Sequence, residues 1–87
     1  MGYWVNTKGF PGYEINDDGE VRNKKTKKIL KPYLNRPGGY YRVNINDKQV
    51  YVHKLMASSF FLRYEEGQRV KHINKKKTDN HLRNLDF

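Results

Sequence analysis

The segment RVKHINKKKTDNHLRNLDF, residues 69–87, restricts the fold more than any other part of the sequence. RVKHI has the length and composition of a short strand, and it carries His72. Residues 74–84 are too polar to be buried, so we expect an exposed loop, and Leu85 and Phe87 are typical of the start of another strand. The segment therefore predicts two short strands joined by a polar loop, with one histidine on the first strand.

The chain upstream of this segment is β-rich. Tyr13 and Ile15 alternate with polar residues, and a DDG turn at residues 17–19 precedes Val21, which predicts a hairpin. A basic turn at residues 24–28 follows.

The middle of the chain predicts extended segments and then a helix. In KILKPYLN, residues 28–35, the proline restricts the chain to extended or edge-strand geometry. YYRVNIN, residues 40–46, alternates apolar and polar side chains, which predicts a strand with one apolar face. VHKLMASSFF, residues 52–61, changes to a helical period and predicts a short amphipathic helix.

These elements together predict an α+β fold. We expect a small β-rich module of antiparallel strands at residues 1–50, and the helix with the C-terminal segment at residues 51–87. A chain of 87 residues buries only a modest core, so both parts should belong to one continuous globular unit.

Composition narrows the function classes. The absence of cysteine excludes disulfides and thiolate metal sites and suits a reducing cytoplasm, and no apolar run is long enough for a membrane span. The formal net charge of +9 makes a polyanion the first partner to consider. The alternative is a basic surface with no specific ligand.

His72 is the candidate catalytic residue. Cleavage of a phosphodiester by a nuclease needs a base that activates water and a cation held over the phosphate, and an imidazole can supply the base. A single histidine is also compatible with a structural role.

A resemblance gives this histidine a context. The order GFPGYEINDDGEVRN, KILKPYLN, GYYRVNI, YVHKLMASSFF, GQRVKHIN and KKTDNHLRNLDF resembles the HNH nucleases of phages and introns, in which a NUMOD-type module precedes the HNH segment. The resemblance covers nearly the whole chain. It implies a ββα-metal type of C-terminal segment and N-terminal strands that read DNA.

Individual positions match that pattern. His72 matches the water-activating histidine, and Asn80 and Asn84 match asparagines that hold the active-site loop by hydrogen bonds. His53 matches a histidine whose expected role is packing or capping of the helix.

Two departures predict that the metal site is lost. Lys71 stands where active members carry a metal-binding aspartate, and an ammonium group there repels a divalent cation. The sequence ends at Phe87, before the helix that bears the family's other metal ligand, so we expect a truncated, degenerate HNH segment. The turn after His72 also departs from the family's pattern, because Asn74, Lys75 and Lys76 replace Asp-Gly-Asn.

We therefore expect no bound metal and no cofactor, with Mg²⁺ required only if the chain cleaves DNA. Lys71 could stabilise a phosphate oxygen in place of the metal. A zinc site built from His53, His72 and His81 is a poor match to known ligand spacing, and we reject it.

Basic and aromatic residues are the remaining candidates for contact with nucleic acid, because cations neutralise phosphates and tyrosines can stack on bases. The alternative for any single tyrosine is packing within a sheet. The predicted nucleic-acid-binding residues are Lys24, Lys25, Lys27, Lys28, Lys31, Arg36, Tyr40, Arg42, Lys71, Lys75, Lys76 and Lys77.

Three functions are compatible with the sequence. The first is an HNH-like protein that binds nucleic acid, DNA in preference to RNA, without metal-dependent cleavage. The second is a phage inhibitor that binds a host defence nuclease such as a CRISPR effector or a restriction enzyme. The third is an active nicking or homing endonuclease cut short at Phe87. Each would act in the cytoplasm, away from membranes.

Overall fold

The computed structural model describes residues 3–87. Within this range the chain forms eight short strands, one α-helix and one 3-10 helix. In chain order they are β1 (Trp4–Asn6), β2 (Tyr13–Asn16), β3 (Val21–Asn23), β4 (Tyr33–Asn35), β5 (Tyr40–Ile45), β6 (Lys48–Tyr51), α1 (Val52–Phe60), β7 (Lys71–His72), η1 (Leu82–Asn84) and β8 (Leu85–Asp86).

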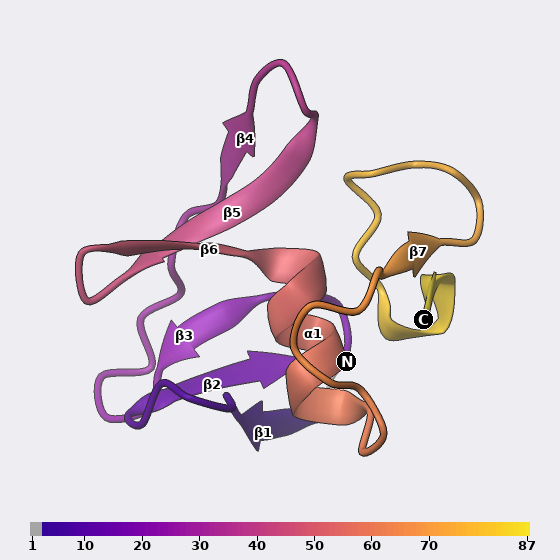
Figure 1. Ribbon diagram of the computed structural model, residues 1–87. Coiled ribbons are helices and arrows are strands. Elements are labelled where there is room, and N and C mark those ends of the chain that lie inside the picture. The colour runs from indigo at the N-terminus through magenta and orange to yellow at the C-terminus, as the bar shows by residue number, and fades with distance from the viewer. Residues whose placement is uncertain (1–2) are drawn as a thin grey trace.

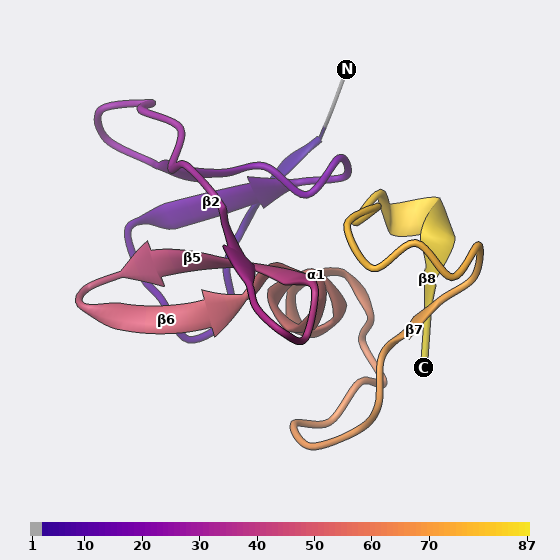
Figure 2. The ribbon, with the colours of Figure 1, turned by 90° about the horizontal axis from the view of Figure 1, so that it is seen from above.

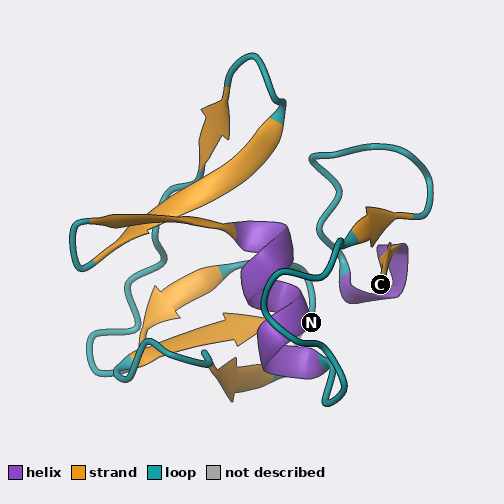
Figure 3. Ribbon diagram, in the orientation of Figure 1, coloured by secondary structure: helices purple, strands orange, loops and turns teal. Residues whose placement is uncertain are grey.

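The strands pair in three antiparallel sheets around the helix. Sheet A has the order β1-β2-β3, sheet B has the order β4-β5-β6, and β7 pairs with β8. The helix α1 lies at the centre, between sheets A and B and the β7–β8 pair (Figures 1 and 2). Figure 3 shows how much of the remaining chain is loop. The predicted α+β fold with antiparallel strands and one short helix is confirmed.

The predicted hairpin is the β2–β3 pair, in which Ile15 lies opposite Val21. Its turn is held by Asn16, whose Oδ1 accepts hydrogen bonds from the backbone N–H groups of Asp18 and Glu20 at 3.0 and 2.8 Å. Gly19 takes φ +86° in this turn, a conformation that residues with a Cβ rarely adopt. The side-chain cap and the glycine explain why the chain reverses here.

Sheet B has one buried and one outward face because side chains alternate along a strand. Val43 and Ile45 are buried toward the core, while Asn44 is exposed on the other side. The β5–β6 turn consists of Asn46 and Asp47, both with positive φ, as a two-residue type I′ hairpin turn requires.

The helix is stabilised by packing, because a nine-residue helix is marginal in isolation. Val52, Leu55 and Met56 are at most 2% exposed and contact the core residues of the two sheets. The helix ends at Phe60 because Phe61 is extended. None of the helices in residues 3–87 is long and apolar enough to cross a membrane.

The prediction that residues 74–84 are too polar to be buried is wrong at two positions. Asn80 and Asn84 are 6% and 8% exposed. Both amides make hydrogen bonds within the protein, which offset the loss of water as a partner.

Candidate active site and nucleic-acid interface

His72 on β7 is 8% exposed and forms a hydrogen bond with Asn80, in which the His72 Nε2 to Asn80 Oδ1 distance is 2.8 Å. An amide oxygen can only accept, so Nε2 carries a proton, and in the neutral ring the lone pair is on Nδ1. His72 is thus held in the tautomer in which Nδ1 can accept a proton. This arrangement is the one that a general base needs.

Asn84 ties the loop after β7 together. Its Nδ2 donates to Asn74 Oδ1 and to the Asp79 carbonyl, both at 2.9 Å, and its Oδ1 accepts from the Asn74 backbone N–H at 3.0 Å. Asn80 and Asn84 thus do different work: Asn80 fixes the histidine and Asn84 fixes the loop. In the sequence, Asn74 stands out only as a departure from the family's turn, and no pattern predicts it as the hydrogen-bond partner of Asn84.

An aromatic cluster centred on His53 borders His72. The ring centroid of His53 lies 4.6 Å from that of Tyr40, 5.4 Å from that of Tyr51 and 5.4 Å from that of His72. Tyr40 is 5.9 Å from His72 in the same measure. Tyr40, expected to contact nucleic acid, is therefore half-buried among rings from β6, α1 and β7.

His53 packs in this cluster and does not cap the helix, since the N-cap residue is Tyr51 and makes no side-chain cap bond. Burial lowers the pKa of His53 to about 4, and the nearby His72 and Lys54 add to the effect. His53 Nδ1 is buried with no hydrogen-bond partner among residues 3–87. The ring is therefore neutral near pH 7.

The structure shows no cluster of metal-binding side chains at His72 within residues 3–87. Lys71 is exposed on β7, opposite Asp86 on β8, and no group of three His, Cys, Asp or Glu side chains that could hold an ion occurs between residues 3 and 87. His81 does not join His53 and His72, because its Nε2 lies 3.2 Å from Asp18 Oδ1 and its Nδ1 accepts from the Arg83 N–H.

The predicted basic residues are exposed except for Arg42, and most of them fall into two groups. Figure 1 places the turn after β3, residues 24–28, on the side of the molecule away from the loop at residues 75–77, and Figure 2 agrees. Lys77 links the second group to the β4–β5 turn: its Nζ donates to the Gly38 carbonyl at 3.1 Å and lies 5.0 Å from the centroid of the Tyr40 ring. Arg36 is exposed in the same turn, whereas Lys31 lies between the two groups in sequence.

The outward face of sheet B carries a second candidate surface. A pocket of about 330 Å³ there is lined by Tyr33, Arg42, Asn44 and Gln49 among others. Arg42 Nε is buried and has no partner within the described part of the chain. Asn44 and Gln49 lie directly opposite each other on β5 and β6. Of these, the sequence singled out only Arg42, although strand alternation places Asn44 on the same face.

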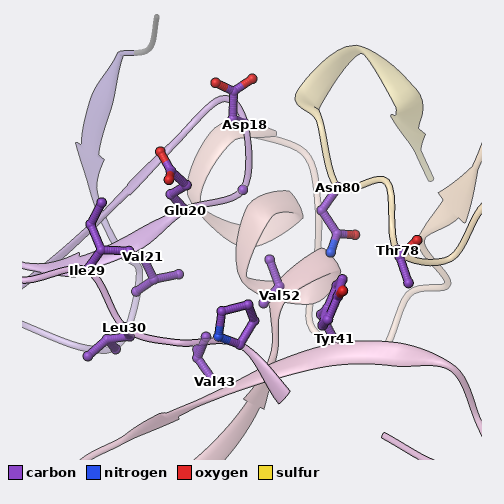
Figure 4. Close-up of a pocket in the computed structure, with 12 residues that line it drawn as sticks. Asp18, Glu20, Val21, Ile29, Leu30, Tyr41, Val43, Val52, Thr78 and Asn80 are labelled. Atoms are coloured by element: carbon purple, nitrogen blue, oxygen red, sulfur yellow. The ribbon is translucent and has the colours of Figure 1, made fainter. Parts of the chain in front are cut away.

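A second pocket, of about 220 Å³, lies between the β2–β3 turn, β5, α1 and the loop before η1 (Figure 4). Its lining includes Val21, Val43 and Val52 together with Asp18 and Asn80. The pocket therefore borders the residue that fixes His72.

The family model described as the NUMOD4 motif matches residues 3–46. DNA endonuclease I-HmuI of Bacillus phage SP01 is 36% identical over 87 residues, which is 94% of this chain and 49% of that protein. The SPbeta prophage-derived putative HNH homing endonuclease YosQ of Bacillus subtilis (strain 168) is 33% identical over 84% of this chain and 44% of its own length.

A solved structure of DNA binding and cleavage by the HNH homing endonuclease I-HmuI superposes with a TM-score of 0.82 and 34% identity, over 95% of this chain and 50% of that chain. The chain belongs to the HNH endonuclease family and carries a NUMOD4 motif at its N-terminal side. It spans half or less of the length of these relatives.

Proposed function

We propose that this chain binds DNA through its N-terminal module and its lysine loops, and that it does so without metal-dependent cleavage. The observation that carries the proposal is Lys71, an ammonium group beside His72 where the family pattern has a metal-binding aspartate. A fixed positive charge at that point favours a phosphate and opposes a divalent ion.

The charge distribution supports DNA as the ligand. The loop at residues 75–77 places three exposed lysines next to the β4–β5 turn, to which Lys77 is hydrogen-bonded. Exposed lysines of this kind bind phosphates through release of counterions, which makes the affinity depend on salt. The relative I-HmuI is a DNA endonuclease by name, which favours DNA over RNA.

We propose further that residues 1–50 form the DNA-contacting module and that residues 51–87 form the HNH-like segment. On this division the outward face of sheet B supplies base contacts. Arg42, Asn44 and Gln49 have the side-chain types that bind guanine and adenine edges in the major groove.

Binding of a labelled duplex and a matched RNA, followed by fluorescence anisotropy at several salt concentrations, tests the proposal. Replacing Lys75, Lys76 and Lys77 by glutamine should lower the slope of log affinity against log salt by about 2 to 3, since each lost phosphate contact removes roughly 0.9. Lys8→Gln is the control, because Lys8 is exposed outside both groups and should leave the slope unchanged.

Absence of DNA binding near physiological salt would contradict the proposal. In that case a protein partner becomes the better candidate, and a host defence nuclease or CRISPR effector is the one to test first. Equal affinity for the RNA would contradict the preference for DNA alone.

A further inference from the structure

Three consecutive residues of the β2–β3 turn contact three consecutive residues around Asn80. The Leu82 backbone N–H donates to the Asp17 carbonyl at 2.7 Å, and His81 Nε2 lies 3.2 Å from Asp18 Oδ1. Gly19 approaches Asn80 itself. The turn and the loop are far apart in sequence, so the fold alone brings them together.

Gly19 permits an approach that no other residue would. A Cβ added at Gly19 would lie 3.0 Å from Asn80 Cβ and 3.1 Å from the Asn80 carbonyl oxygen. A methyl group there would therefore displace the backbone of Asn80 by several tenths of an ångström. The atoms it meets belong to the backbone and to Cβ, which cannot swing aside as the end of a long side chain can.

Asn80 connects the β2–β3 turn to His72. Its side chain is 6% exposed, and its Oδ1 is the partner of His72 Nε2 at 2.8 Å. Asn80 also lines the 220 Å³ pocket, together with Asp18 and Gly19. Figure 4 shows the side chains of Asn80 and Asp18 at this pocket.

We infer that the β2–β3 turn positions His72 through Asn80, with Gly19 as the positioning residue. Sheet A thereby holds the imidazole in the Nε2–H tautomer and leaves Nδ1 able to accept a proton. The inference goes beyond the proposed function and concerns only the geometry of His72, so it can be tested without nucleic acid.

Gly19→Ala is the direct test, with Gly9→Ala as its matched control. Gly9 has φ +85° against +86° for Gly19, but a Cβ at Gly9 would meet nothing within 4 Å. Both variants carry the same backbone strain, and only Gly19→Ala presses on Asn80. The readout is the ¹⁵N spectrum of the His72 ring, which distinguishes the tautomers, together with solvent exchange of the Nε2 proton.

In Gly19→Ala we expect the His72 Nε2 proton to exchange about tenfold faster than in the parent protein, with a shift of the tautomer ratio towards Nδ1–H, because a buried hydrogen bond is weakened. Gly9→Ala should leave both readouts as in the parent. If His72 gives the same spectrum in both variants and the parent, the inference is wrong. If Gly19→Ala acts only through backbone strain, both variants lose stability, and the ¹⁵N spectrum and proton exchange of His72 stay as in the parent.

If Gly19→Ala does not fold, Asn16→Ser provides the second test. It shortens the side chain that caps the turn without adding an atom against Asn80. The expected result is again faster exchange of the His72 Nε2 proton. An unchanged exchange rate in a folded Asn16→Ser protein would overturn the inference.

Discussion

Acidification should destabilise the protein through His53. The folded-state pKa of His53 is about 4, because the ring is buried and faces Tyr40, Tyr51, His72 and Lys54. In the unfolded chain an imidazole has a pKa of about 6.5. The unfolded state therefore binds the proton first. This contribution to stability is present above about pH 6.5 and is lost as the pH falls towards 4.

The magnitude follows from the two pKa values. Linkage gives a loss of about 2 kcal/mol at pH 5 and about 3 kcal/mol at pH 4, relative to pH 7. Carboxylates titrate over the same range, so the total stability cannot isolate His53. The difference between the parent protein and His53→Phe does, because the other groups are common to both.

The assay is urea unfolding of both proteins at pH 7, 6, 5 and 4, monitored by tryptophan fluorescence. At pH 7 the two should agree within about 1 kcal/mol, since phenylalanine fills the same aromatic cluster. At pH 5 His53→Phe should be more stable than the parent by about 2 kcal/mol beyond its difference at pH 7. Tyr51→Phe changes a ring in the same cluster without removing a histidine and should show no such change with pH. A parent–variant difference that is constant from pH 7 to pH 4 would refute the reasoning.

Three further changes should lower stability by amounts that urea unfolding can measure. Asn84→Ala removes three hydrogen bonds and should lower the free energy of unfolding by about 2 to 3 kcal/mol. Asn44→Ala, at an exposed position, should lower it by less than about 0.5 kcal/mol. Equal losses would contradict the role of Asn84. Arg22→Gln removes a guanidinium that lies 3.8 Å from the centroid of the Trp4 ring. It should lower the free energy of unfolding by about 1 kcal/mol and change the tryptophan emission spectrum. An unaltered spectrum would count against that contact. Met56→Ala at a 0% exposed position should cost about 2 to 5 kcal/mol, and a loss below about 1 kcal/mol would show that Met56 is not in a packed core.

Local patterns in the sequence were enough to predict most of the secondary structure. The hairpin with its turn at residues 17–19 follows from alternation and turn residues, and the helix follows from the change of period at Val52. These signals depend on neighbours in sequence. The burial of Asn80 and Asn84 could not be found in this way, because it depends on which distant groups meet them.

For the candidate site too, the sequence indicated the main residues but not the contacts between distant parts of the chain. The histidine and the two asparagines emerged from the resemblance, and the structure brings His72 and Asn80 to within hydrogen-bond distance. The contact of Gly19 with Asn80 and the position of Tyr40 beside His53 both join segments far apart in the chain. Polar composition predicts exposure on average, and it fails where a loop supplies its own hydrogen-bond partners.

The claim that the chain holds DNA without cutting it is tested most directly by incubating saturating protein with supercoiled plasmid in Mg²⁺ at about 0.15 M salt, then checking both binding and strand breaks. We predict a bound complex whose plasmid stays supercoiled after the protein is removed. Mg²⁺-dependent nicks that disappear in His72→Ala would contradict the account and identify this chain as a working nuclease.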